Sequence, residues 1–155
     1  MLFRSHCEAV LSGYMGSSEI GAAIIDAVAR VKYVNPNALY ACDPVLGDVG
    51  KGFFVKPDMP DFMRDHVVPR ADIVTPNLFE LESLTGQQCK TLEDIKRALK
   101  ILHDQGPRII LLTSAVIDKT PTDAMDMIVS DTRDVFRVRT PRLKFSPNEI
   151  GRAHV

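Results

Sequence analysis

The chain has 155 residues, of which 45% are hydrophobic and 25% are charged, and its 19 basic and 20 acidic residues leave a net charge of −1. This length is sufficient for one domain with its own core, and the balanced charge argues against a nucleic-acid-binding protein that relies on a basic face. No apolar run approaches the roughly 18 residues of a membrane span, so we expect neither nucleic-acid nor membrane partners, and the three cysteines without C-x-x-C spacing suit a reducing cytoplasm.

Hydrophobic periodicity, cap residues and turn residues divide the chain into alternating strands and helices. In chain order, the predicted elements are a strand at 7–14, a helix at 17–36, a strand at 38–44, a glycine-rich loop at 43–54, a helix at 58–68 capped by Asp58, a strand at 71–76, helices at 77–86 and 91–106, a strand at 108–114 and a hairpin at 123–140. This order predicts an α/β fold, in which a mostly parallel sheet is flanked by helices on both faces and followed by a C-terminal β-hairpin.

The loop "DPVLGDVGKGFF" at 43–54 has the glycines and the lysine of many phosphate-binding loops. It is not a Walker motif, which needs four residues between its glycines and then a lysine followed by a hydroxyl residue. The loop must therefore bind phosphate in another way, if it binds phosphate at all.

Polar side chains follow three successive predicted strands. Because ligands of open α/β sheets bind beyond the carboxyl ends of the strands, these side chains are expected to meet at one edge. Oxygen ligands of this kind suit a magnesium ion that keeps part of its hydration shell. The candidates are Asp43, Asp48, Thr75, Asn77, Glu80, Thr113 and Ser114.

Each candidate also has a purely structural interpretation. Asp43 before a proline can start a turn, and Asn77 with Glu80 can form a capping box at the start of the helix at 77–86, which is compatible with a functional role. Thr113 and Ser114 can mark an ordinary transition from strand to loop. Only the convergence of the whole set at one sheet edge favours a binding site.

Four stretches in the same order, "GYMGS", "CDPVLGDVGKGFFV", "VVPRADIVTPNLFELESLTG" and "ILLTS", resemble the pyridoxal (vitamin B6) kinases of the ribokinase-like superfamily. The resemblance covers nearly all of residues 6–114. It implies ATP-dependent phosphorylation of the 5′-hydroxyl of pyridoxal with Mg²⁺, in a cytoplasmic homodimer. The alternatives are a hydroxymethylpyrimidine kinase of the same superfamily and a non-catalytic nucleotide-binding module.

Carried over residue by residue, the resemblance gives the candidates different roles. It implies that Asp43 and Glu80 organise the metal and the triphosphate of ATP, and that Asn77 holds this network in place. The other candidates are implied to border the nucleotide phosphates: Asp48, Thr75, Thr113 and Ser114.

The resemblance also implies parts that this chain lacks. The catalytic aspartate of the family lies in a Gly-Thr-Gly-Asp motif that is expected beyond this chain, so none of its residues is assigned as catalytic. We expect a single partial kinase domain over residues 1–155, truncated at both ends and inactive alone, whose exposed sheet edges and helix faces promote association. Residues 1–5 and 149–155 are expected to be non-native flanks, because "MLFRS" and "EIGRAHV" can be back-translated to a common sequencing adapter; the alternative is a native terminus of unusual sequence.

Overall fold

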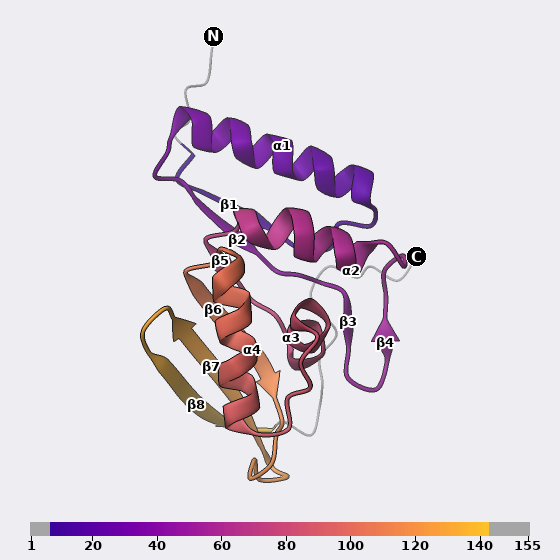
Figure 1. Ribbon diagram of the computed structural model, residues 1–155, viewed down its shortest axis with the longest axis vertical. Helices are drawn as coiled ribbons and strands as arrows, with labels where there is room; N and C mark the ends of the chain where they lie inside the picture. The colour runs from indigo at the N-terminus through magenta and orange to yellow at the C-terminus, as the bar shows by residue number, and fades with distance from the viewer. Residues whose placement is uncertain (1–6, 143–155) are drawn as a thin grey trace.

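A computed structural model describes residues 7–142 of the chain, and the two expected non-native flanks lie outside the described residues. The described residues form one six-stranded sheet, four α-helices and a separate small β-hairpin, arranged as in Figure 1. In chain order the labelled elements are β1 (Ala9–Ser12), α1 (Ser18–Val34), β2 (Leu39–Cys42), β3 (Gly47–Asp48), β4 (Gly52–Phe53), α2 (Met59–Phe62), β5 (Ile73–Val74), α3 (Leu78–Thr85), α4 (Leu92–Gln105), β6 (Ile109–Ala115), β7 (Ala124–Asp131) and β8 (Val135–Pro141).

The strands of the large sheet lie in the order β1-β2-β5-β6-β7-β8. The first four are parallel, whereas β7 pairs antiparallel with both β6 and β8. The predicted α/β class, the mostly parallel sheet and the C-terminal hairpin are therefore confirmed. Within the described residues, none of the helices is both long and apolar enough to cross a membrane.

The helix ends follow from the residues at the caps. Ser17 accepts a hydrogen bond from the amide of Ile20 and starts α1, while Thr91 and Asp94 form a reciprocal capping box at the start of α4. Gly86 ends α3 in the left-handed conformation, which costs glycine little because it has no Cβ atom. Asp58 occupies the predicted N-cap position of α2, but its side chain makes no capping hydrogen bond there.

The segment predicted as one helix at 58–68 differs from a regular α-helix. The α-helical part α2 is followed by a π-helical turn at Met63–Val67 and a 3₁₀ turn at Val68–Arg70. Pro69 has no amide hydrogen and cannot extend α-helical hydrogen bonding through these turns. Met63 and Val67 nevertheless point inward and are completely buried.

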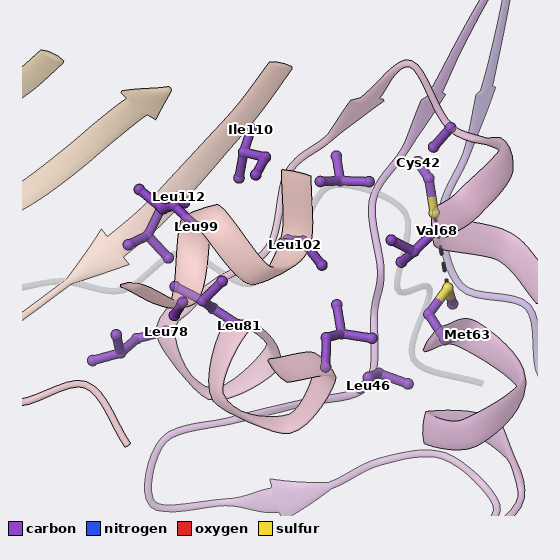
Figure 2. Close-up of a cluster of buried hydrophobic side chains, with 14 of the residues drawn as sticks. Cys42, Leu46, Met63, Val68, Leu78, Leu81, Leu99, Leu102, Ile110 and Leu112 are labelled. Atoms are coloured by element: carbon purple, nitrogen blue, oxygen red, sulfur yellow. Dashed lines mark hydrogen bonds between the residues drawn. The ribbon is translucent and has the colours of Figure 1, made fainter. Parts of the chain in front are cut away.

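The hydrophobic core lies between the helices and one face of the large sheet. Strand side chains Tyr40, Cys42, Val74, Ile110, Leu112 and Ile128 are all buried in one cluster with residues from every labelled helix. Figure 2 shows part of this cluster, including the contact of 3.9 Å between the Cys42 Sγ and Met63 Sδ atoms. Burying such side chains contributes about 1.5–3 kcal/mol each.

The opposite face of the sheet, which we call the open face, carries a second apolar set. Strand pairing puts these alternate residues in register, so they point to the same side. All of them are half-buried or exposed. They are Leu11, Leu39, Ala41, Ile73, Ile109, Leu111, Met127, Val129, Phe136 and Val138.

The helices thus pack on one face of the sheet within the described residues, in contrast to the predicted cover of both faces. Strands β1, β2, β5 and β6 follow one another in the same direction across the sheet. Since crossovers between parallel strands are right-handed, a constant direction places every connecting helix on the same side. The alternation of strands and helices predicts the layers but not this direction, which depends on which strands become neighbours.

Candidate functional site

The ends of three neighbouring strands meet at the carboxyl edge of the sheet. Asp43 directly follows β2, Thr75 directly follows β5, and the Thr75 Oγ1 donates a hydrogen bond to the Asp43 Oδ1 (3.3 Å). Thr113 in β6 extends the parallel pairing by a bridge to Asn77, and its amide donates to the Pro76 carbonyl at 2.8 Å. The structure therefore brings these four candidates together at the predicted edge.

Asn77 and Glu80 join the start of α3 to this edge. The Asn77 Oδ1 accepts from the Glu80 amide (2.9 Å), and the Glu80 Oε2 accepts from the Asn77 amide (2.8 Å), which completes the predicted capping box. The same side chains also bind the loop after β2: the Glu80 Oε1 accepts from the Leu46 amide (3.0 Å), and the Asn77 Nδ2 donates to the Gly47 carbonyl (2.8 Å). The first turn of α3 thus fixes the position of the loop that follows Asp43.

The loop itself folds into the antiparallel hairpin of β3 and β4, which the sequence did not predict (Figure 1). Phe53 in β4 packs edge-on against Phe79 in α3, with their ring centroids 4.9 Å apart. Asp48 lies in β3, where its carboxylate forms an ion pair of 3.3 Å with Lys51 and accepts a hydrogen bond from the Val49 amide. Asp48 is therefore oriented toward the tip of the hairpin.

Gly47 allows this hairpin to pack against α3. A Cβ atom at this position would overlap the Gly52 carbonyl oxygen and lie 2.6 Å from the Phe79 ring. We expect Gly47→Ala to separate β3 from β4, to destabilise the chain by about 1–3 kcal/mol, and to accelerate amide hydrogen exchange at Phe54, whose amide donates to the Leu46 carbonyl.

Gly13→Ala is the matched control, because a Cβ atom there has no neighbour within 4 Å. Mass spectrometry or NMR would measure the exchange at Phe54. Equal exchange in the wild-type chain and the Gly47→Ala variant would contradict the role assigned to this glycine.

The charge of the site is concentrated in two carboxylates. Glu80 is only 4% exposed; burial raises its pKa to about 7, and the nearby charge of Asp43 acts in the same direction. A divalent cation beside these carboxylates would offset both effects, so the residues present fit a metal ion. In the described part of the chain, no group of three or more His, Cys, Asp or Glu side chains is suited to a metal ion. Water and phosphate oxygens would therefore complete the coordination of a Mg²⁺ ion at Asp43 and Glu80, as is usual for this ion.

Ser114 departs from the regular strand that the sequence predicted. The pairing of β6 with β7 is irregular between Leu112 and Ala115, and Ser114 has a positive φ of 54°. Such a backbone is uncommon for residues other than glycine and often occurs at functional sites. Ser114 is exposed whereas Thr113 is half-buried, so the two predicted neighbours lie in different environments.

Sequence reasoning missed the partners that the chain contributes through its backbone. The Leu46 backbone amide donates to Glu80, and the Gly47 backbone carbonyl accepts from Asn77. Every residue except proline carries both backbone groups, so the sequence does not show which of them will make these bonds. Phe79 lies between Asn77 and Glu80 in the sequence, and only its contact with Phe53 distinguishes it from an ordinary core residue. The available indication was the pair of phenylalanines that ends the glycine-rich loop.

Comparisons with known proteins place this site in a family context. The family model described as phosphomethylpyrimidine kinase matches residues 2–150. The chain is 54% identical to pyridoxal kinase PdxY of Granulibacter bethesdensis, over 95% of this chain and 53% of the relative. It resembles the crystal structure of pyridoxal kinase from Entamoeba histolytica, with 33% identity and a TM-score of 0.78 over 90% of this chain and 49% of that one.

A third similar protein is pyridoxal kinase from Leishmania donovani in complex with ADP and pyridoxamine. It shares 26% identity and a TM-score of 0.75, over 86% of this chain and 47% of that one. The chain thus spans about half the length of the curated relatives it matches. Their common fold agrees with the ribokinase-like architecture that the sequence motifs indicated.

Proposed function

Because the chain belongs to the phosphomethylpyrimidine kinase family over residues 2–150, we propose that it forms the phosphate-binding part of an ATP-dependent pyridoxal kinase. The full activity would transfer the γ-phosphoryl group of ATP to the 5′-hydroxyl of pyridoxal. The convergence of Asp43, Thr75 and Glu80 at one edge of the sheet is the observation that carries this proposal. The names of the relatives, and the ADP and pyridoxamine bound to the Leishmania donovani enzyme, support it.

In this proposal, Asp43 and Glu80 hold a Mg²⁺ ion, and Asn77 keeps Glu80 and the loop at Gly47 in place. When bound, the ion would neutralise the charge that builds up on the phosphoryl oxygens. The capping box fixes Glu80 before any ligand arrives, so little reorganisation is required. The remaining candidates border the nucleotide phosphates in this proposal: Asp48, Thr75, Thr113 and Ser114.

The general base is not among the residues with an assigned role, and we propose that it belongs to a part of the kinase domain outside this chain. Deprotonation of the 5′-hydroxyl needs a carboxylate within hydrogen-bond reach of that oxygen. The chain is then one partial domain that does not turn over pyridoxal by itself. By analogy with the family, we propose that the whole kinase is a cytoplasmic homodimer.

A chimeric kinase tests the proposal directly. Residues 7–142 would replace the matching region of the Granulibacter bethesdensis relative, and pyridoxal-dependent release of ADP would be measured with Mg-ATP. We expect activity in the chimera and a fall in kcat of about 100-fold or more in its Asp43→Asn and Glu80→Gln variants, as for the loss of a group that stabilises transition-state charge. Asp61→Asn, which changes an exposed carboxylate in α2, is the control.

The description of the matching family model favours a second candidate, a hydroxymethylpyrimidine kinase. Competition between pyridoxal and hydroxymethylpyrimidine in the same chimera separates the two, since kcat/KM measures the preference for each substrate. Nucleotide binding without turnover of either substrate would instead indicate a non-catalytic module. Activity that is unchanged in the Asp43→Asn and Glu80→Gln variants would refute the proposed site.

A further inference from the structure

Lys51 in the glycine-rich loop has no role in the proposed function. It is exposed at the tip of the hairpin of β3 and β4, where its Nζ atom lies 3.3 Å from the Asp48 Oδ2 and its amide donates to the Asp48 carbonyl at 3.1 Å. Gly50 and Gly52 flank it with positive φ angles of 79° and 78°, a conformation that residues with a Cβ atom rarely adopt. The Gly-Lys-Gly sequence thus builds a turn that presents a lysine beside the Asp48 carboxylate.

The ion pair of Lys51 with Asp48 leaves the lysine accessible to a ligand. The two side chains are 67% and 45% exposed, and exposed pairs of this kind usually add little to stability because water solvates both charges. An ammonium group has three hydrogens, so Lys51 can keep its contact with Asp48 and still donate to another anion. The fold therefore does not depend on this lysine, which is free to serve a binding role.

Hydrogen bonds place the base of the same hairpin at the candidate site. The Gly47 carbonyl accepts from the Asn77 Nδ2 at 2.8 Å, and the Phe53 ring packs against α3. Asp48 directly follows Gly47, and the backbone of Lys51 is bonded to Asp48. The lysine is therefore one residue and one backbone hydrogen bond away from the carbonyl that contacts Asn77, on a hairpin that lies beside α3 (Figure 1).

The charge of the site calls for a cation that the other candidates do not supply. Apart from Lys51, the segments that form the site (43–54, 75–80 and 113–114) contain no lysine or arginine, whereas Asp43, Asp48 and Glu80 are all acidic. The triphosphate of ATP is itself strongly negative, and one Mg²⁺ ion offsets only part of its charge. An unpaired Asp48 carboxylate beside the phosphates would repel them.

We propose that Lys51 binds the phosphates of the nucleotide directly, with its ammonium group between them and the Asp48 carboxylate. The inference rests on the proposed function, because that function places Asp48 beside the nucleotide phosphates. Lysine is a common phosphate ligand and acts there as a point charge. In this position the same group attracts the phosphates and offsets their repulsion by Asp48.

Nucleotide affinity tests this inference in the chimeric kinase. Dissociation constants for Mg-ATP would be measured by isothermal titration calorimetry with no pyridoxal present. We expect Lys51→Met to weaken binding about tenfold or more, as for the loss of one hydrogen bond to a charged group, and Lys51→Arg to retain most of the affinity because it keeps the charge. Lys100→Met is the matched control, since Lys100 forms an exposed ion pair with Asp104 in α4.

A double variant separates binding of the phosphates from neutralisation of Asp48. Asp48→Asn combined with Lys51→Met removes the repulsive carboxylate together with its counter-ion. We expect this variant to bind Mg-ATP more tightly than Lys51→Met alone but more weakly than the unchanged chimera. Full recovery of the affinity would overturn the inference, because Lys51 would then act only by offsetting the charge of Asp48.

Chemical modification gives a second readout that needs no substitution. The lysines of the chimera would be acetylated with acetic anhydride, with and without saturating Mg-ATP, and the modification of each lysine would be measured by peptide mass spectrometry. We expect Mg-ATP to protect Lys51 and to leave Lys100 equally reactive. Equal modification of Lys51 in both samples would overturn the inference, and so would an unchanged affinity in Lys51→Met.

Nucleotide binding and phosphorylation can fail separately in these experiments. A chimera whose binding of Mg-ATP depends on Lys51, but which does not phosphorylate pyridoxal, would refute the proposed function and leave the phosphate ligand intact. A chimera that phosphorylates pyridoxal with an unchanged KM for ATP in Lys51→Met would do the reverse. A chimera that binds no Mg-ATP at all would overturn both.

Discussion

In metal-free buffer, the free energy of unfolding is expected to decrease by about 2–3 kcal/mol between pH 5 and pH 8, and the Glu80→Gln variant is expected to lose most of this dependence. The pKa of Glu80 is raised from its ordinary value of 4.5 to about 7, mainly because burial disfavours the charged carboxylate. The unfolded chain therefore releases this proton at a lower pH than the folded chain does. The stabilisation is complete below pH 4.5 and is lost as the pH rises through about 7, at about 1.4 kcal/mol for each pKa unit.

The pH range of this effect distinguishes Glu80 from carboxylates whose pKa values are lowered in the folded chain. Asp126, bonded to Arg139 and Thr120, and Asp94, bonded to Thr91, have lowered pKa values, so they affect stability only in more acidic solution. Added Mg²⁺ is expected to reduce the loss at pH 8, because a cation beside Asp43 and Glu80 favours their charged forms.

Urea denaturation followed by circular dichroism at several pH values would measure the effect. The control is Glu93→Gln, which removes an exposed carboxylate near the start of α4. A slope that persists in Glu80→Gln would show that another group is responsible.

Replacement of Arg139 by methionine is expected to destabilise the chain by about 3–5 kcal/mol, since it leaves the carboxylate of Asp126 buried without its partner. Asp126 in β7 is completely buried and lies opposite Arg139 in β8. The Arg139 Nε and Nη2 donate to the two carboxylate oxygens at 2.7 and 3.0 Å, and the Thr120 Oγ1 donates to the same carboxylate at 2.9 Å. The Thr120 hydroxyl also accepts from the Ile117 amide, so this network fixes the segment that follows Ser114.

A double variant shows whether the loss of stability comes from the unpaired charge of Asp126 or from the loss of its ion pair with Arg139. Asp126→Leu combined with Arg139→Met is expected to recover most of the stability, because apolar residues can often replace a buried ion pair at little cost. Arg30→Met removes an exposed pair with Asp26 and is expected to change stability by less than about 1 kcal/mol. If the single and double variants are equally unstable, the unpaired carboxylate is not the cause.

The sequence predicts those parts of the fold that depend on neighbouring residues. The capping boxes of Asn77 with Glu80 and of Thr91 with Asp94 can be read from spacing alone, and so can the glycine that ends α3. The meeting of Asp43 and Thr75 follows from a general rule about strand ends. Their roles in binding remain predictions, because geometry alone does not identify the ligand.

Other features depend on contacts between distant segments and could not be predicted in this way. The hydrogen bond from the Leu46 amide to Glu80 joins residues 34 positions apart, and one of the two groups is backbone. The hairpin of β3 and β4 forms where Phe53 meets Phe79, and the bulge at Ser114 forms where β6 meets β7. The single covered face depends on strand order, which the alternation of strands and helices leaves undetermined.

The order of the parallel strands also has a consequence for synthesis on the ribosome. Along β1, β2, β5 and β6, each strand pairs with the strand of this sheet that precedes it in the chain, so this part of the sheet can form strand by strand as it is synthesised. The segment can acquire its core before later residues are translated, as domains do when they fold during synthesis. During that interval we expect Leu11 and Ile109 to be exposed, as they are in the structure, which would promote association with other apolar surfaces.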